Sequence, residues 1–322
     1  MTALLGIDYG GTRTKLVLRA TADRRILARE EVATGDLPDL AGHVRSFVGE
    51  AQVQRFGMSV AGTFDAVTGV VGRSTNMPWL DGTAPADVLA ELVAIPGVAV
   101  QDGIATAIAE ARIGAGRGVQ DVFVIALGTG IAGAHVVGGE VRAGAHGAAG
   151  EIGHLCIGGP HSCSCGQTGC LETLIGGAQL GRRWVEEASG QGAAAAAASL
   201  TGAATAREVV AAAEVGDHAA QQVLDRGARA LARALLHVSA LIDPGVLVFG
   251  GGLARSPEWT VHPAVRFAQQ AATFHELPQV RLAELGVWAG AHGALLYAAG
   301  AEDGWTRGHS ADRLMGDQPR RG

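Results

Sequence analysis

Two stretches of the chain share one hydrophobic pattern, in which a short apolar run ends at glycines and a second apolar run follows. The first covers residues 4–18 and breaks at Gly10-Gly11-Thr12, and the second covers residues 121–137 and breaks at Gly128-Thr129-Gly130. Short apolar runs bounded by glycine predict a strand, a tight turn and a second strand. The same hairpin therefore occurs twice, which predicts an internal duplication of the fold.

The remaining pattern predicts alternating helices and buried strands, and so an α/β protein. The glycines of the two hairpins precede strands, whereas dinucleotide-binding and P-loop motifs require a helix directly after their glycines. Those two motifs are therefore excluded. The expected helices cover residues 37–52, 104–111, 177–188, 205–214, 217–242 and 288–301, and the expected strands cover residues 55–60, 67–71, 98–101 and 246–249.

Composition limits the class of protein. The 322 residues are 48% hydrophobic, which is enough to bury a core and to form two lobes. No signal peptide and no membrane span are expected, because glycines and His135 interrupt the apolar run of residues 122–137. The net charge of -6 argues against a nucleic-acid partner, since binding phosphate backbones needs clustered positive charge. We expect a cytoplasmic protein with reduced cysteines.

One segment, residues 151–172, concentrates metal-ligand chemistry. Cys163, Cys165 and Cys170 lie within eight residues of one another, and His154 lies nine residues upstream of the first. Three thiolates and one imidazole suit zinc in a closed tetrahedral site, which would be structural. The alternative is that the cysteines are buried apolar residues or disulfide partners. Cys156 is left over, and we expect it to be a small buried hydrophobe.

Two glutamates flank this predicted metal site. Glu151 precedes His154 by three residues, and Glu172 follows Cys170 by two residues, so an ion that holds His154 and Cys170 also orders both acids. Carboxylates held in this way can accept hydrogen bonds from a polyhydroxylated ligand. The alternative is that both are solvated or helix-terminal glutamates.

Two aspartates stand where predicted strands end. Asp8 lies near the end of the first strand, and Asp102 follows the strand of residues 98–101 at the start of a helix. A carboxylate at the first position can meet a metal ion, and one at a strand-to-helix junction can act as general base toward a hydroxyl. The alternative for Asp102 is a helix N-cap.

Phosphate-binding candidates lie in the glycine turns and at one lysine. Backbone amides in the two hairpin turns can approach phosphate oxygens, although each turn alone could be an ordinary hairpin. Lys15 is the single lysine among 25 basic residues, so it is either a phosphate ligand or a plain strand lysine. Gly250-Gly251-Gly252 follows the strand of residues 246–249 and can lie beneath an adenine ring, or it is an ordinary turn.

The chain resembles the zinc-containing branch of the ROK family of sugar kinases and sugar-responsive repressors over residues 4–300. The motifs G-I-D-x-G-G-T at the first hairpin, E-x-G-H, and C-x-C-G-x-x-G-C-x-E carry this resemblance. It implies a two-lobed, actin-like (ribonuclease H-like) kinase fold, with duplicated mixed sheets, a Cys3His zinc knuckle, and two phosphate hairpins that face each other across a cleft. It further implies that the last helix crosses back to the first lobe as a hinge.

The resemblance also assigns roles to residues. Asp102 is the expected catalytic base, and the expected metal ligands are His154, Cys163, Cys165 and Cys170. The expected sugar contacts are Gly62, Asn76, Gln101, Asp102, Glu151, His154 and Glu172. The expected nucleotide contacts are Asp8, Gly10, Gly11, Thr12, Lys15, Gly128, Thr129, Gly130, Gly251 and Gly252. The chain departs from the family at Gln101, Ile104 and Ala61, where asparagine, asparagine and proline are typical, and this puts the outer part of the sugar pocket in doubt.

The resemblance therefore implies a hexose kinase that uses ATP, Mg²⁺ and structural zinc, works as a homodimer, and is a glucokinase acting on the 6-hydroxyl. Other hexoses such as N-acetylmannosamine or fructose, polyphosphate as donor, and a non-catalytic sugar sensor remain alternatives. A repressor is not expected, because the first phosphate strand begins at Leu4 and leaves no room for a helix-turn-helix domain. The expected lobes are residues 1–112 with 288–301, and residues 113–287, followed by a disordered tail at 302–322.

Overall fold

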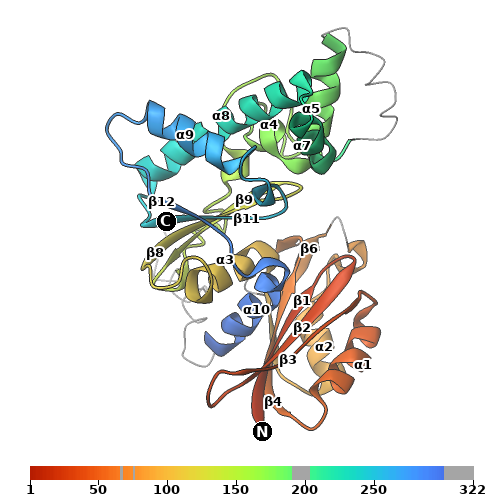
Figure 1. The fold of residues 1–322 in the computed structure, drawn as a ribbon. Helices are drawn as coiled ribbons and strands as arrows, with labels where there is room; N and C mark the ends of the chain where they lie inside the picture. Colours follow the sequence, from red (N-terminus) through yellow and green to blue (C-terminus); the bar gives the residue numbers. More distant parts are fainter. Residues whose placement is uncertain (66–67, 75–76, 191–203, 301–322) are drawn as a thin grey trace, which may run out of the picture. The chain divides into compact units, whose positions relative to one another are not determined.

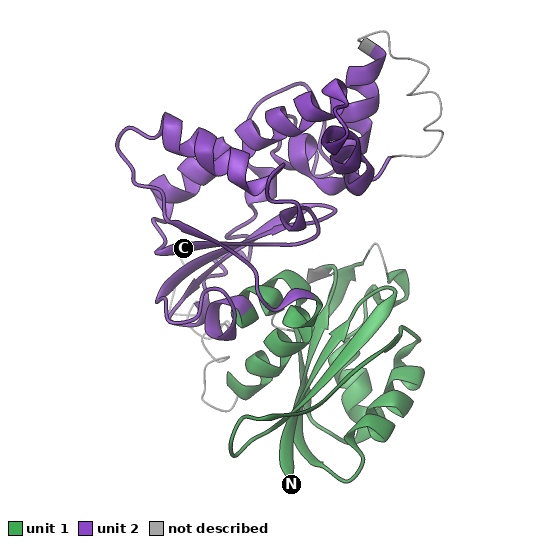
Figure 2. Ribbon diagram, in the orientation of Figure 1, with its two compact units in different colours: residues 1–109, 287–322 green, residues 110–286 purple. Residues whose placement is uncertain are grey.

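The computed structural model describes residues 1–65, 68–74, 77–190 and 204–300 (Figure 1). The chain forms two compact units (Figure 2). The first consists of Met1–Ala109 together with Val287–Gly322, and the second consists of Glu110–Gly286. Each unit has its own five-stranded sheet and its own hydrophobic core. The expected tail at residues 302–322 lies outside the described residues.

The first unit is built on a mixed sheet with the strand order β3-β2-β1-β4-β7. Strand β1 pairs antiparallel with β2 and parallel with β4, so the hairpin expected at residues 4–18 is confirmed. A separate two-stranded sheet joins β5 and β6. The strands are Thr2–Tyr9 (β1), Arg13–Ala20 (β2), Ile26–Ala33 (β3), Gln52–Val60 (β4), Thr63–Phe64 (β5), Val71–Arg73 (β6) and Gly97–Gln101 (β7).

Helices cover both faces of this sheet. Because successive strand residues point to opposite faces, Leu5 and Ile7 lie in the core cluster beneath α1 and α2, while Leu4 packs against Ala291 and Leu295 of α10. By the same alternation Asp8 lies on the α10 side of the sheet. The helices of this unit are Leu37–Val48 (α1), Pro78–Leu80 (η1), Pro85–Val93 (α2), Gly286–Trp288 (η4) and Ala289–Gly300 (α10), and Asp102–Ile113 (α3) begins in it.

The second unit repeats this plan with the strand order β10-β9-β8-β11-β12. Strand β8 pairs antiparallel with β9, its hairpin partner, and parallel with β11 on its other side. The expected duplication is therefore confirmed, since β1 and β8 have the same kind of neighbour on each side. The strands are Asp121–Leu127 (β8), Ile131–Val137 (β9), Glu140–Val141 (β10), Val246–Gly250 (β11) and Gln279–Leu282 (β12).

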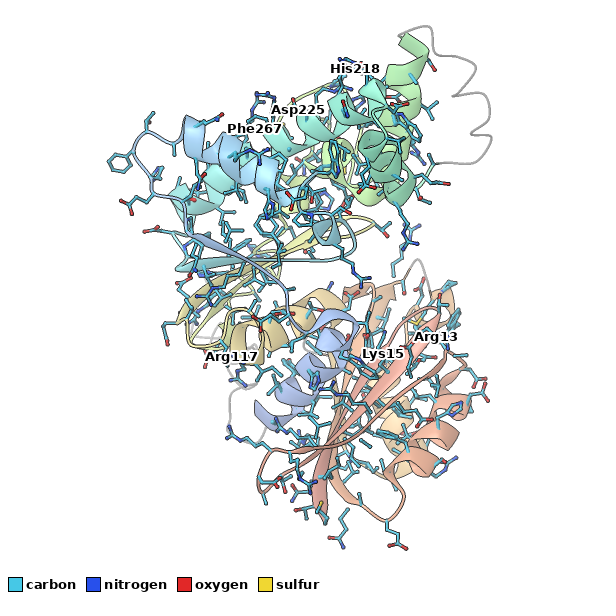
Figure 3. The ribbon with its side chains drawn as sticks, viewed as in Figure 1. Arg13, Lys15, Arg117, His218, Asp225 and Phe267 are labelled. Atoms are coloured by element: carbon cyan, nitrogen blue, oxygen red, sulfur yellow. The ribbon has the colours of Figure 1, made fainter. Side chains whose placement is uncertain are left out.

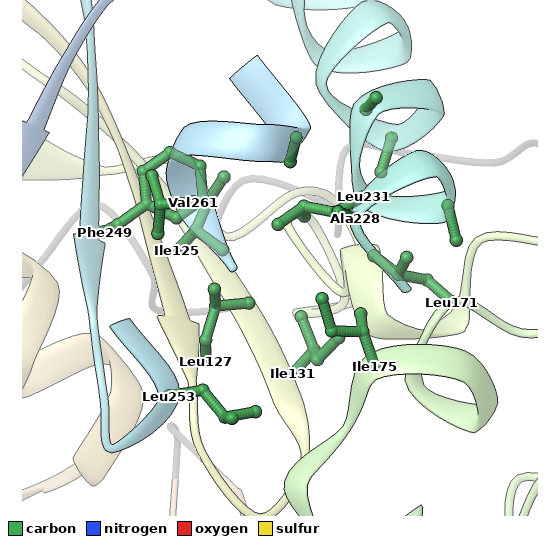
Figure 4. Packing of buried hydrophobic residues seen from close by; sticks show 14 of the residues in the cluster. Ile125, Leu127, Ile131, Leu171, Ile175, Ala228, Leu231, Phe249, Leu253 and Val261 are labelled. Carbon is green, nitrogen blue, oxygen red and sulfur yellow. The ribbon is translucent and has the colours of Figure 1, made fainter. Parts of the chain in front are cut away.

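The helices of the second unit pack on one continuous apolar cluster, part of which Figure 4 shows around Ile125, Leu231 and Phe249. Thr205 forms the expected capping box with Glu208. None of the helices in the described ranges, the 24-residue α8 included, is long and apolar enough to cross a membrane. The helices are Ile152–His154 (η2), Glu172–Ile175 (α4), Gly177–Gly190 (α5), Ala206–Glu214 (α7), His218–Leu241 (α8), Leu253–Arg255 (η3) and Val261–Ala271 (α9).

A buried glutamate joins the two ends of the second unit. Glu110, the first residue of that unit, has no exposed surface. Its carboxylate accepts hydrogen bonds from the backbone N–H of Ala115 at 3.0 Å, of Glu284 at 3.2 Å and of Leu285 at 2.9 Å. The segment that enters the unit is thereby fastened to the segment that leaves it.

Several elements differ from the sequence prediction. The strand expected at residues 67–71 is found as Val71–Arg73, and residues 68–70 form no strand. Among the longer elements, β3, α2, α9 and β12 were not predicted. Strand β3 lies at the edge of its sheet, where the sequence ILAREEVA is largely solvent-exposed and has no strict apolar alternation. Edge strands bury little, so their pattern carries little signal.

Candidate active site and metal centre

The predicted base, Asp102, and the predicted nucleotide contact Asp8 lie at one edge of the first sheet. Asp8 is paired with Ser59 of β4, and Ser59 is paired with Val100 of β7, so the carboxyl ends of these parallel strands are level. Asp102 directly follows β7 and begins α3. The fold of the first unit therefore brings Asp8 and Asp102 together.

Asp8 is held on both of its oxygens. Lys15 Nζ lies 3.3 Å from Oδ2, and Ser59 donates its hydroxyl to Oδ1 at 3.2 Å. Both the Asp8 and Lys15 side chains keep a small exposed fraction, 19% and 15%. Lys15, labelled in Figure 3, thus neutralises Asp8 rather than standing alone as a free cation. Ser59 was not predicted, because only the register between β1 and β4 shows that it meets Asp8.

Burial raises the pKa of Asp102, and the nearby Asp8 carboxylate raises it further, while the N–H of Gly103 at 2.8 Å lowers it. The net pKa lies above the ordinary value of an aspartate.

The alternative role of Asp102, as the N-cap of α3, is taken by its neighbour Gln101. The side-chain Oε1 of Gln101 accepts a hydrogen bond from the N–H of Ile104 at 3.0 Å. Asp102 is therefore not needed as the cap for Ile104.

The first glycine turn, Gly10-Gly11-Thr12, is tied to the loop that follows β3. Thr34 donates its hydroxyl to the carbonyl of Gly10 at 2.6 Å, and its N–H to the carbonyl of Thr12 at 3.1 Å. The carbonyls of Gly10 and Thr12 are thereby occupied, and the turn is fixed to this loop. The sequence offered no sign of Thr34 as a partner, since it lies beyond an unpredicted strand.

The expected outer sugar loop is only partly described. Gly62 lies two residues after the end of β4 and directly before β5. Asn76 lies outside the described residues. Trp79 is in η1 with 51% of its surface exposed, so it does not belong to the core.

His154, Cys163, Cys165 and Cys170 form a four-residue cluster in the second unit. Their ligand atoms all lie within 4.8 Å of one another. Cys163 Sγ is 3.6 Å from His154 Nδ1, and Cys165 Sγ is 3.7 Å from Cys170 Sγ. Zinc bonds of about 2.3 Å to sulfur and about 2.0 Å to nitrogen give tetrahedral edges of roughly 3.5–3.8 Å. The donor set and its spacing therefore fit a tetrahedral zinc ion.

The cysteines of this segment differ in environment. Burial raises the pKa of the Cys170 thiol to about 12, whereas the N–H of Gln167 lowers the pKa of the Cys165 thiol. A metal binds thiolates, so an ion at this cluster would release the proton from Cys170. Cys156 lies outside the cluster, and the expectation that it is buried is wrong: it is exposed and its thiol faces the carbonyl of Thr168 at 3.6 Å. It bridges the backbone of Cys170 with its own backbone, which turns its side chain outward.

The second glycine turn lies directly on Glu172. The N–H of Ile131, the first residue of β9, donates to Glu172 Oε2 at 2.8 Å. A Cβ at Gly130 would lie 2.4 Å from the same oxygen, so only glycine permits this approach. Glu151, the other predicted acid, is exposed and precedes η2. The spacing of Glu172 to Cys170 was visible in the sequence, but its contact with the turn was not.

Gly251, a predicted nucleotide contact, lies next to the same turn. Its φ is +89°, and a Cβ there would lie 2.3 Å from the carbonyl of Leu127, the residue before Gly128. Gly251 and Gly252 therefore adjoin the end of β8, where the turn begins. The second unit thus gathers this turn, Gly251, Glu172 and the Cys3His cluster.

Comparison with known proteins gives one consistent result. The model of the ROK family matches residues 4–301. The glucokinase of Halalkalibacterium halodurans is 29% identical over 333 residues, covering 96% of this chain and 98% of that protein. The N-acetylmannosamine kinase of Escherichia coli O9:H4 (strain HS) is 32% identical over 278 residues, covering 84% and 90%. A ROK family glucokinase from Streptomyces griseus, solved with glucose and AMPPNP, superposes with a TM-score of 0.74 at 28% identity, covering 92% and 99%.

Proposed function

This chain belongs to the ROK family, and we propose that it is an ATP-dependent hexose kinase, a glucokinase that phosphorylates the 6-hydroxyl of glucose. Sugar kinase activity follows from the family and from its kinase relatives. The observation that carries the catalytic assignment is Asp102, a largely buried carboxylate with a raised pKa beside Asp8.

Asp102 is the proposed general base. A base works best when its pKa lies close to the working pH, and burial moves the pKa of Asp102 in that direction. In its ionised form the Asp102 carboxylate can accept the proton of the attacking hydroxyl. The gain expected from such a base is about 10²–10⁴-fold in rate.

Asp8 is the proposed residue for Mg²⁺, which takes oxygen ligands and keeps several waters. Its carboxylate offers two oxygens, is partly exposed, and is oriented by Ser59 and Lys15, so it fits such an ion. When bound, the ion supplies charge neutralisation for the phosphate groups. Lys15 adds a fixed positive charge on the same side.

The glycine segments are the proposed contacts for ATP, and the acids of the zinc segment are the proposed contacts for the sugar. N–H groups of the turns at Gly10–Thr12 and Gly128–Gly130 are directed at phosphates, and Gly251 and Gly252 provide bare backbone for the base. Glu151, His154 and Glu172 meet sugar hydroxyls, joined by Gly62, Asn76 and Gln101. Zinc, when bound, supplies only the rigidity of this segment, because three thiolates and one imidazole leave no open position.

N-acetylmannosamine is the second candidate substrate, because the Escherichia coli kinase named for it is 32% identical over 84% of this chain. Gln101 and Ile104 replace the typical asparagines, which bears on which hexose fits. Sequence identity to the known kinases therefore does not decide between glucose and N-acetylmannosamine, and the specificity constants kcat/KM for the two sugars have to be compared.

The test is a panel of hexoses with Mg·ATP, in which ADP formation is measured for glucose, N-acetylmannosamine, fructose and mannose, with polyphosphate as an alternative donor. We expect glucose to give the highest kcat/KM with ATP. In parallel, Asp102→Asn should lower kcat by about 10²–10⁴-fold while glucose binding stays nearly unchanged, because the amide keeps the size of the side chain but takes no proton. A variant that retains more than a third of the wild-type rate would exclude Asp102 as the base.

A further inference from the structure

Three hydrogen bonds fasten the turn after β8 and the start of β9 to the N-termini of α4 and α5. The N–H of Gly177 donates to the carbonyl of Gly128 at 2.9 Å, and the N–H of Ala178 donates to that of Thr129 at 2.9 Å. The third bond is the one from Ile131 to Glu172 at 2.8 Å. Only this third bond depends on a side chain, so a single substitution can remove it.

The bond to Glu172 holds the point where the turn becomes strand β9. Ile131 faces Leu127 as the last pair of the β8–β9 ladder, and Gly128 closes the turn by donating to the carbonyl of Gly130 at 2.9 Å. Hydrogen bonds that involve a carboxylate are roughly twice as strong as neutral ones. The carboxylate therefore sets the position of the N–H groups on the turn.

Apolar packing also holds Ile131, through its side chain in the core. The side chain of Ile131 is 4% exposed and belongs to one cluster with Leu171 and Ile175, which flank Glu172 in sequence. Figure 4 shows Ile131 and Ile175 side by side, with Leu171 beside them. Backbone and side chain of Ile131 are thus both held by the segment of residues 171–175, which begins immediately after Cys170.

We infer that Glu172 is a positioning residue for the phosphate-donor turn Gly128–Gly130, in addition to its proposed contact with the sugar. This inference rests on the proposed function, in which that turn binds the phosphates of ATP. A carboxylate has two oxygens, and the bond to Ile131 uses one of them. Glu172 therefore links the acceptor site to the donor site within the second unit, so its loss affects the use of ATP and not only the use of the hexose.

The test compares Glu172→Gln with Glu151→Gln in the full-length, zinc-loaded protein. Both substitutions remove one carboxylate from the proposed sugar site, but only Glu172 touches the turn. We expect Glu172→Gln to raise the KM for Mg·ATP about five- to tenfold, the effect of replacing a charge-assisted hydrogen bond by a weaker neutral one, and to speed amide hydrogen exchange at residues 128–131. We expect Glu151→Gln to raise only the hexose KM and to leave exchange at the turn unchanged.

Gly130→Ala provides a second route, because its Cβ displaces the carboxylate without removing the charge. It should reproduce the exchange change and the higher KM for Mg·ATP while the hexose KM changes less. Unchanged exchange at residues 128–131 in both variants, or a rise in the hexose KM alone, would overturn the inference. Failure of the proposed function looks different: the wild-type protein would then form no ADP with any hexose, although Glu172→Gln would still loosen the turn.

Discussion

Acid should destabilise this protein through one buried histidine on α10. His292 is 5% exposed, and its Nε2 lies 2.9 Å from Nη2 of Arg29, a guanidinium that only donates hydrogen bonds, so the ring must be neutral at this atom. Arg29 also lies over the ring of Trp288 at 5.6 Å. Burial, followed by the charges of Arg29 and Arg19, lowers the pKa of His292 to about 4.

The size and sign of this loss of stability follow from the difference between the pKa of His292 in the folded and in the unfolded protein. In the unfolded chain the pKa of this histidine returns to 6.5, so on acidification the unfolded state takes the proton first. Stability is therefore complete above pH 6.5 and is lost as the pH falls toward the folded pKa of about 4. The loss from His292 alone is about 2 kcal/mol at pH 5 and about 3 kcal/mol at pH 4. Domains are commonly stable by only about 5–15 kcal/mol, so this is a large share.

The assay is urea unfolding at pH 7 and pH 5 for the wild type and for His292→Gln, which keeps an acceptor for Arg29 but does not titrate. Between these pH values the wild type should lose about 2 kcal/mol more than the variant. His43→Gln, at an exposed position on α1 of the same unit, should behave like the wild type. Equal losses in the wild type and in His292→Gln would refute the idea that His292 is held neutral in the folded protein.

Three further predictions concern the metal sites and the junction of the chain. Asp8→Ala should weaken Mg·ATP binding more than glucose binding, because its carboxylate is the proposed Mg²⁺ ligand; unchanged Mg·ATP binding by calorimetry together with unchanged turnover would contradict this role. Cys165→Ser should lower the zinc content found by elemental analysis and raise the hexose KM, since ordered ligands bind better; a zinc-free protein that binds its hexose as tightly as the native one would refute it. Glu110→Ala should lower the free energy of unfolding by about 3 kcal/mol, because one buried and two partly buried N–H groups lose their acceptor. The exposed Glu214→Ala should change it by less than about 0.5 kcal/mol, and equal effects would show that Glu110 does not fasten the junction.

The amino-acid sequence alone was enough to predict the parts of this protein that depend on short stretches of chain. Both glycine hairpins, the capping box at Thr205 and the spacing of the Cys3His cluster were predicted and are found in the structure. Each of these features depends on residues that are close together in sequence, so turn chemistry, periodicity or ligand spacing can be recognised without knowing the fold. The family resemblance rests on the same local motifs.

The tertiary structure decided what distant segments do to one another. Ser59 meets Asp8 only through the register of β1 and β4, and Thr34 meets the first turn only because β3 leads back to it. Glu172 binds Ile131 across 41 positions, and Cys156 turns outward because its backbone, not its thiol, pairs with Cys170. No local pattern encodes such contacts. They depend on which strands pair and in which register, and burial of the whole core selects that arrangement.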